Sequence, residues 1–339
     1  MRLWDDEIEA LRPAIESEAP QFIEAFLANR PGPEAVHASR AERVARHRAG
    51  MEAMTFPSDT GRDRMIPGPG GPLRLRVFRP AGAARAVMLH IHGGGWVVGR
   101  PEVSDRLNEL ICDSDRIAVV SADYRLAPEH PYPAALDDCE AAAVWLLANA
   151  GREFGSERLL IGGESAGGHL AAATLLRVRD RHRAAARFVG ANLVFGPYDL
   201  GRLPSQRGVG VRADILTPEE LEFFLDLFTP GLDAEARRDP AISPLYADLA
   251  GLPPAFFTVG AADHLLDDTL LLAARWSVAG NPTELLVYPG APHGCIGLPS
   301  VGAHWLPRML DFIARCAGSS STGDGSPAAA AESRGRQHG

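Results

Sequence analysis

The chain of 339 residues contains no lysine, so all 34 of its basic residues are arginines. This absence excludes Schiff-base chemistry and cofactors that are anchored through a lysine. Cysteine is also scarce, because the four residues are widely spaced and form no Cys-x-x-Cys pair or cluster with histidine. Such spacing is typical of free thiols and indicates neither a zinc site nor a disulfide framework. The composition therefore indicates neither a lysine-anchored cofactor nor a zinc site built on cysteines.

The sequence also lacks the features of a membrane protein, a secreted protein or a nucleic-acid-binding protein. No apolar run approaches the roughly 20 residues that a membrane helix needs. The acidic segment 1–7 lacks the basic start and apolar stretch of a secretory signal. The net charge of −9 argues against a nucleic-acid partner, which needs a basic face. We expect a soluble, cytoplasmic protein that acts on a small molecule, and the sequence leaves a homodimer open.

The pattern of apolar residues predicts an α/β fold. The alternation over 73–78 suits an outer strand. Longer apolar runs, typical of strands that are buried on both faces of a parallel sheet, follow at 86–92, 116–121, 158–163, 188–195, 255–260 and 283–288. Helical stretches separate them at 103–114, 133–150, 166–180 and 267–280. This alternation predicts a mostly parallel, doubly wound sheet that binds ligands at the carboxyl ends of its strands.

Three segments lie outside this alternation. Residues 1–50 show helical spacing without a strand signal, so we expect a helical appendage broken at 31–33. Residues 200–235 form an insertion in which Thr217 and Glu220 predict a capping box. We expect both segments to form a helical cap over a core at 51–317, and the Gly- and Ser-rich segment 318–339 to be a disordered tail.

The run Gly163-Glu164-Ser165-Ala166-Gly167 directly follows a predicted strand and precedes a predicted helix. This is the context that a nucleophile elbow requires, because the tight turn holds the serine hydroxyl out at the end of the sheet. By itself the motif is weak in a chain with 35 glycines, where a simple strand-to-helix turn can look the same. Together with the flanking elements, it identifies Ser165 as a candidate nucleophile.

A second glycine-rich run, His92-Gly93-Gly94-Gly95-Trp96, also follows a predicted strand. Glycines let backbone N–H groups approach a bound carbonyl and act as preorganised donors to its developing negative charge. We assign the oxyanion-hole donors to the amides of Gly93, Gly94 and Ala166. A flexible loop is the alternative reading, and it does not explain why the run lies at a strand end.

A base and an acid that orients it should follow the serine, in the order acid and then histidine. Asp263 and His293 each come just after a predicted strand, at the edge where Ser165 must lie. We therefore expect His293 to be the general base and Asp263 to orient it. Asp267 is the rival to Asp263, but it lies one helical turn farther from the strand end.

With these residues in place, the sequence resembles the bacterial hormone-sensitive-lipase family of esterases, also called the α/β-hydrolase fold-3 family. The resemblance covers about residues 60–315 and rests on the runs 92–96, 123–138, 163–168, 243–244 and 292–294 and on Asp263 with Asp267. It implies an α/β-hydrolase fold with a helical cap and hydrolysis of short- to medium-chain acyl esters, without a metal or cofactor. It also implies that the run 124–138 braces the loop that carries the oxyanion hole.

The sequence departs from the family pattern at three positions near the site. Glu164 replaces the more common Asp or Thr before the nucleophile, and we expect its carboxylate to bond neighbouring backbone. We expect Glu164, His92 and Asp267 to support the site without taking part in the reaction. His264 replaces the usual Pro, which predicts a less rigid turn after Asp263. Cys295 replaces a large apolar residue, which predicts a wider pocket.

Other functions of the same fold stay open at this point. The residues expected of a triad serve a biosynthetic acyl transferase or a lactone or amide hydrolase equally well. A non-catalytic, receptor-like binding protein is the third reading, and the presence of all three residues disfavours it. Phe22, Phe26, Phe223 and Phe224 are candidates for the pocket wall or for the core of the cap.

Overall fold

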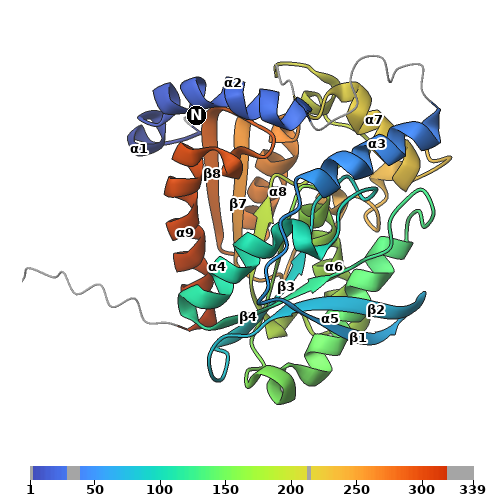
Figure 1. Ribbon diagram of the computed structural model, residues 1–339, viewed down its shortest axis with the longest axis vertical. Coiled ribbons are helices and arrows are strands. Elements are labelled where there is room, and N and C mark those ends of the chain that lie inside the picture. Colours follow the sequence, from blue (N-terminus) through green and yellow to red (C-terminus); the bar gives the residue numbers. More distant parts are fainter. Residues whose placement is uncertain (1–2, 29–38, 212–214, 319–339) are drawn as a thin grey trace, which may run out of the picture.

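The computed structural model describes residues 3–28, 39–211 and 215–318, and a mixed sheet runs through the middle of this part of the chain (Figure 1). Within these residues the sheet has eight strands in the order β1-β2-β4-β3-β5-β6-β7-β8. They are β1 (Arg62–Gly68), β2 (Gly71–Phe78), β3 (Ala86–Ile91), β4 (Ile117–Ala122), β5 (Leu159–Glu164), β6 (Phe188–Val194), β7 (Ala255–Ala262) and β8 (Thr283–Pro292). Only the pairs β1–β2 and β2–β4 are antiparallel. The predicted mostly parallel sheet is therefore confirmed.

Helices cover both faces of the sheet, as a doubly wound fold requires. The principal ones are α4 (Asp105–Asp115), α5 (Ala134–Phe154), α6 (Ala166–His182), α8 (Leu266–Val278) and α9 (Pro299–Ala317). Helices α5, α6 and α8 share one buried apolar cluster with the sheet, and α4 and α9 share another. Strand β3 supplies both clusters alternately, with Val87 and Leu89 on one face and Ala86 and Met88 on the other. This alternation explains why the strand reads as a continuous apolar run.

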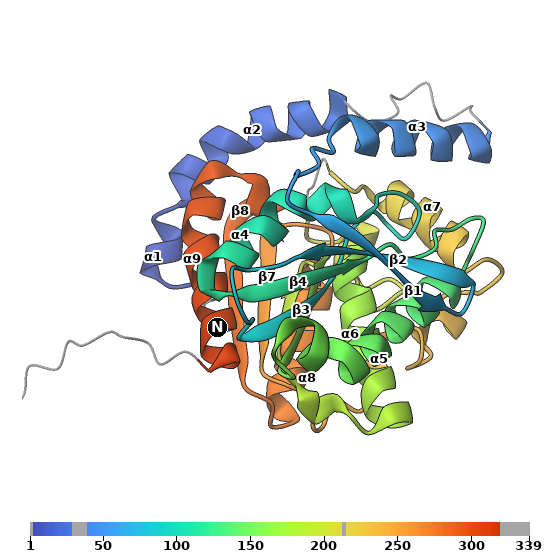
Figure 2. The same cartoon turned by 60° about the horizontal axis from the view of Figure 1, so that its bottom comes forward.

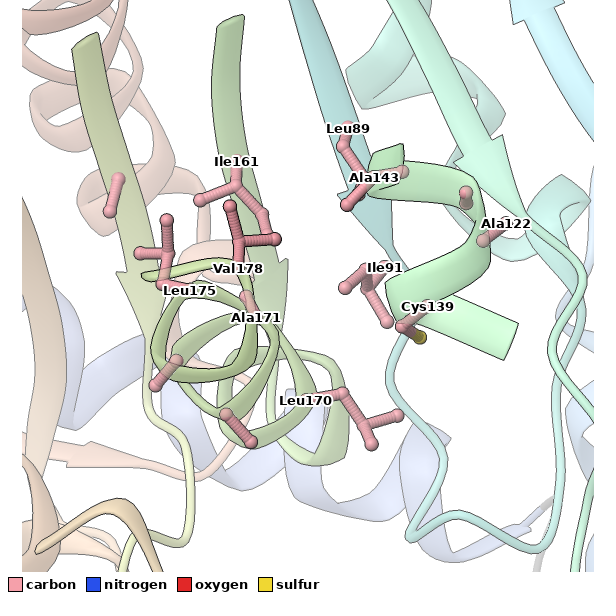
Figure 3. Packing of buried hydrophobic residues seen from close by; sticks show 14 of the residues in the cluster. Leu89, Ile91, Ala122, Cys139, Ala143, Ile161, Leu170, Ala171, Leu175 and Val178 are labelled. Carbon is pink, nitrogen blue, oxygen red and sulfur yellow. The ribbon is translucent and has the colours of Figure 1, made fainter. Parts of the chain in front are cut away.

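Helix α6 is the central helix of the first cluster, and its residues from Ala166 to Val178 are all buried. Figure 3 shows Val178 of α6 next to Ile161 of β5, and Cys139 of α5 next to Ile91 of β3. Burying an aliphatic side chain of this size contributes about 1.5–3 kcal/mol. This packing fixes where α6 begins, and the helix begins one residue after Ser165.

Helices form in both segments that the sequence predicts as the cap. Helices α1 (Asp6–Glu9) and α2 (Arg12–Ala28) pack against β8 and α9, and Figure 2 shows α2 and α3 (Arg40–Ala53) running along the same side of the molecule. Helix α7 (Pro218–Phe228) belongs to the insertion and begins with the predicted capping box of Thr217 and Glu220. Helix α3 meets α7 through His47, whose ring centroid lies 5.1 Å from that of Phe224.

Strands β7 and β8 extend well past their predicted ends, and both extensions concern the site. Strands β7 and β8 run on to Ala262 and Pro292, because their ladder continues past an irregularity at Gly260. Asp263 and His293 therefore directly follow these two strands. Strand β1 was not predicted, because most of its residues are exposed and carry no apolar alternation. The predicted break at 31–33 and the predicted tail beyond Gly318 lie outside the described residues.

One finding concerns membranes. Across residues 3–28, 39–211 and 215–318, no helix combines the length and the apolar character needed to cross a bilayer.

Candidate active site

Ser165 occupies the sharp turn between β5 and α6. Its backbone has φ of 55° and ψ of −123°, a conformation that L-residues rarely adopt and that costs on the order of 1–3 kcal/mol. Its amide donates to the carbonyl of Val194 at 2.9 Å, which ties the turn to β6. A Cβ atom on the nearby Gly167 would lie 1.9 Å from the carbonyl oxygen of Ile91, so only glycine allows β3 and α6 to approach this closely. The sequence motif thus produces a strained elbow that exposes the serine hydroxyl.

The candidate nucleophile, base and acid lie in one hydrogen-bonded line. Nε2 of His293 is 3.1 Å from Oγ of Ser165, and Nδ1 of His293 is 2.8 Å from Oδ2 of Asp263. Asp263 is fully buried, and its other carboxylate oxygen accepts the amide of Leu265 at 2.8 Å. The structure therefore brings together Ser165, Asp263 and His293 from three separate strand ends.

An aromatic side chain that the sequence did not single out supports the imidazole. The ring of Phe195 meets the ring of His293 edge to face, with centroids 4.8 Å apart. Phe195 is buried and follows β6, so it fills the space between the elbow and the histidine loop. Its only sequence signal was its place at the end of a predicted strand.

The three candidate oxyanion donors meet beside Ser165. Gly93, Gly94 and Ala166 all line the cavity that contains the serine. Gly94 has φ of 119°, and a Cβ atom there would lie 2.1 Å from the carbonyl oxygen of Val98, so this turn requires glycine. Ala166 is the first residue of α6, and amides in the first turn of a helix have no partner within that helix.

His92 stabilises the start of the glycine-rich loop 93–95. Its Nδ1 donates to the carbonyl of Gly93 at 2.8 Å, and its ring stacks on Tyr124 with centroids 4.2 Å apart. Burial lowers the pKa of His92 to about 4, so the ring is neutral near pH 7. The Tyr124 hydroxyl donates to the carbonyl of His92 at 2.9 Å, and the amide of Ala127 donates to that of Trp96 at 2.9 Å. These contacts agree with the bracing that the family resemblance implied.

Glu164 has different partners from those expected. Its carboxylate does not bond neighbouring backbone; it lies 3.1 Å from Nε2 of His90 and 3.4 Å from Oγ of Ser104. His90 is fully buried, and its Nδ1 lies 2.9 Å from Oγ of Ser121 on the adjacent strand. The expectation of a backbone partner was wrong because β3 places His90 directly beneath the elbow. Glu164 itself lines the cavity.

The rival acid points away from the histidine. Oδ2 of Asp267 accepts the amide of Ser205 at 2.9 Å, and Oγ of Ser205 donates to the carbonyl of His264 at 2.8 Å. Nδ1 of His264 donates to the carbonyl of Ser205, also at 2.8 Å. The turn after Asp263 is therefore cross-linked to the cap insertion, and the reduced rigidity expected from replacing Pro by His264 stays a prediction.

A cavity of about 370 Å³ extends from Ser165 towards the cap. Its wall includes Phe26 of α2 and Phe224 of α7, whereas Phe22 and Phe223 lie outside it, so only two of the four candidate phenylalanines face the site. Apolar side chains from the cap and core make up most of the remaining wall, among them Met51, Met54, Val98, Val103, Leu107, Leu216, Leu221, Leu265 and Ile296.

Cys295 does not widen this cavity. It is fully buried in the apolar cluster beneath α9 and does not line the cavity, where Ile296 takes its place. The expectation failed because the left-handed Gly294, with φ of 80°, turns the chain so that the next side chain points into the core.

The anchor of the cap insertion includes a buried carboxyl group. Oδ1 of Asp268 accepts the amides of Tyr198 and Asp199, and Oδ2 accepts Nε2 of Gln206 at 2.6 Å. Burial raises the pKa of Asp268 to about 8, and the neighbouring Asp199 carboxylate adds to this effect. The donated hydrogen bonds oppose the increase without cancelling it.

We expect Asp268 to make the protein less stable as the pH rises. Between about pH 4 and 8 the native state holds a proton on Asp268 that the unfolded state has lost, so its stabilising contribution is complete below pH 4 and is lost through pH 8. The decline should approach about 1.4 kcal/mol per pH unit from pH 5 to 7. Urea unfolding of wild type and Asp268→Asn across this range measures it. Parallel pH profiles for the two proteins would contradict the raised pKa.

Comparisons with known proteins give a consistent picture. A family model for the α/β hydrolase fold matches residues 88–297. The carboxylic ester hydrolase LipN of Mycobacterium tuberculosis is 36% identical over 71% of this chain, and the match spans 65% of LipN, just under two thirds of its length. Esterase LipI of the same organism is 35% identical over 70% of this chain and 76% of LipI. An acetyl esterase of Salmonella schwarzengrund is 30% identical over 70% of this chain and 73% of that enzyme.

Solved structures extend the similarity to the whole fold. A hyperthermophilic esterase from Pyrobaculum calidifontis superimposes with a TM-score of 0.76 at 27% identity, covering 94% of this chain and 99% of the esterase. EstE1, a thermostable carboxylesterase from a metagenomic library, superimposes with a TM-score of 0.73 at 29% identity, covering 84% of this chain and 99% of that protein.

Proposed function

The chain belongs to the α/β-hydrolase fold-3 family of hormone-sensitive-lipase-like esterases, and from this membership we propose that it is a serine carboxylesterase that hydrolyses short- to medium-chain acyl esters. One observation carries the proposal. The Ser165–His293–Asp263 line of hydrogen bonds opens into an apolar cavity beside three candidate amide donors. Each part of a two-step acyl transfer thus has a residue in position to perform it.

The first step forms an acyl-enzyme. His293 Nε2 takes the proton of Ser165 as Oγ attacks the ester carbonyl, and the amides of Gly93, Gly94 and Ala166 hold the resulting oxyanion. Asp263 keeps the imidazole oriented and stabilises its positive charge. The protonated His293 then gives its proton to the departing alcohol, and the acyl group stays on Ser165.

The second step releases the acid. His293 takes a proton from a water molecule, which attacks the acyl-enzyme through a second oxyanion in the same hole. The intermediate collapses, His293 returns the proton to Ser165 Oγ, and the carboxylic acid leaves. The sharp turn at Ser165 presents the same side chain to the cavity in both steps.

The cavity supports the proposed range of substrates. Its volume of about 370 Å³ lies near the lower end of the usual range for small-molecule sites, about 300–1,000 Å³. Its apolar wall favours an acyl chain, and its size favours a short or medium one. A cytoplasmic location and a homodimer stay predictions from the sequence.

A panel of substrates tests this function. We expect p-nitrophenyl acetate, butyrate and hexanoate to give higher kcat/KM values than the laurate and palmitate esters, because long chains exceed the cavity. A lactone and an anilide in the same assay separate esterase activity from the lactonase and amidase alternatives, and a second alcohol as acceptor reveals acyl transfer. A fluorophosphonate probe, read by peptide mass spectrometry, should label Ser165. A folded protein that hydrolyses none of the esters and resists the probe would refute the proposal.

A further inference from the structure

Arg48 of helix α3 makes an unusual set of hydrogen bonds with the core. Its Nε donates to the carbonyl of Val97 and its Nη2 to that of Ala127, each at 3.1 Å. The far side of the same guanidinium binds both carboxylate oxygens of Glu129, at 2.8 and 2.7 Å. One planar group thus joins the cap to two loops of the core and fixes their relative geometry.

The Val97 carbonyl belongs to the loop that carries the candidate oxyanion donors. The amides of Val97 and Val98 donate to the carbonyl of Gly94 at 3.1 and 3.0 Å, so they orient the peptide group next to the Gly94 amide. The bond from Ala127 to Trp96 ties the second loop to the same turn. A rotation of the Val97 peptide group would therefore break the hydrogen bond from Val98 to Gly94 and change the orientation of the peptide groups around Gly94.

We propose that Arg48 is a positioning residue for the oxyanion hole, so that helix α3 of the cap holds the oxyanion loop in its active conformation as well as covering the substrate. The inference rests on the proposed esterase function and goes beyond it, because it assigns a role in the chemistry to a side chain that does not touch the reacting atoms.

The burial of its acceptors supports a directing role. Val97 and Ala127 are both buried, so their carbonyl groups have no access to bulk water to replace the guanidinium. An unpaired buried acceptor costs about 1–3 kcal/mol, which a loop can avoid by changing its conformation. Because Arg48 donates to both carbonyl groups, the loops gain nothing by leaving this conformation. The contact with Glu129, which holds the pKa of this carboxyl at about 2, keeps the guanidinium in place.

The same helix also forms the wall of the cavity. His47 and Met51, which flank Arg48 along α3, both line the cavity that contains Ser165. A substrate that presses on this wall therefore acts on the helix that holds the oxyanion loop. Helix α3 therefore links the binding of substrate in the cavity to the geometry of the candidate oxyanion donors.

A second ion pair between α3 and the core offers a matched control. Arg100 Nη2 lies 2.7 Å from Oε1 of Glu52, and both side chains are exposed. An exposed pair of this kind contributes little, about 0–1 kcal/mol. It joins the same helix to the same part of the core, but it binds no carbonyl group of the oxyanion loop.

The test compares Arg48→Met with Glu52→Gln on p-nitrophenyl acetate and butyrate. We expect Arg48→Met to lower kcat about tenfold on both esters with little change in KM, which is less than the roughly 100- to 1,000-fold loss expected from removing a donor outright. Glu52→Gln should stay close to wild type. If Arg48 only anchored the cap, its loss would raise KM for butyrate and leave kcat on acetate unchanged, and that result would overturn the inference.

Two further readouts exclude a loss of folded protein. Endpoint titration with a fluorophosphonate gives the fraction of reactive Ser165, and a kcat deficit that vanishes after this normalisation would overturn the inference. Arg48→Lys should restore thermal stability but not kcat, because an ammonium group cannot bridge both carbonyls and the carboxylate. A trifluoromethyl ketone, which forms an oxyanion on Ser165, should bind Arg48→Met about tenfold more weakly than it binds wild type. Inactive wild type would instead refute the esterase function itself.

Discussion

Replacement of Ser165 by alanine is expected to lower kcat for p-nitrophenyl butyrate about a millionfold, the loss typical of removing the nucleophile from a serine triad. Without Oγ no acyl-enzyme forms, and His293 has no proton to take at 3.1 Å. The variant should still be faster than the uncatalysed reaction in water, and this remaining acceleration should come from the candidate oxyanion donors and substrate binding alone. Steady-state kinetics with a highly purified variant measure it.

The fold should survive this change. Alanine takes the same φ of 55° at the same cost as serine, so the melting temperature should stay close to that of wild type. Ser104→Ala removes another hydroxyl group from the same cavity, one that bonds Glu164 and not His293, and this variant should remain active. Full activity in Ser165→Ala, or equal losses in both variants, would remove Ser165 from the role of nucleophile.

The second large effect separates the two candidate acids. Asp263→Asn should lower kcat about 10,000-fold, because the new amide would place an N–H group against Nδ1 of His293. The imidazole would then carry its proton on Nε2 and could not accept that of Ser165. The bond from Leu265 to Oδ1 would persist, so the loop should keep its shape.

Asp267→Asn is the matched control for this experiment. Asp267 bonds the amide of Ser205 rather than His293, so its replacement should cost no more than about tenfold through a loosened cap insertion. The pH dependence of kcat in each variant gives a second measure, because Asp263 bonds the base directly and Asp267 does not. A larger loss in Asp267→Asn than in Asp263→Asn would reverse the assignment.

The positions of the candidate catalytic residues could be predicted because they depend on chain order and sheet topology. Ser165, Asp263 and His293 each follow a parallel strand, and the carboxyl ends of parallel strands share one edge of the sheet. Each of these polar residues directly follows a strong apolar run, so a short segment of sequence is enough to place it at a strand end.

Contacts across the fold could not be predicted in the same way. Glu164 meets His90 because β3 and β5 are neighbours in the sheet, although the two residues lie 74 positions apart in the chain. Phe26 faces the cavity and Phe22 does not, a difference that depends on how α2 docks on the core. Sequence periodicity gives the apolar face of a helix, but it does not say which neighbour that face meets.

The two segments predicted to form the cap contact different parts of the candidate active site, with Arg48 bound to the loop of the candidate oxyanion donors and Ser205 bound to the loop of the candidate acid. This division limits how the protein can be re-engineered. A chimera that exchanged only the cap to obtain a new substrate range would lose the hydrogen bonds to both of these loops. A successful graft must bring equivalents of both anchors, so selectivity and turnover in this scaffold are to be redesigned together.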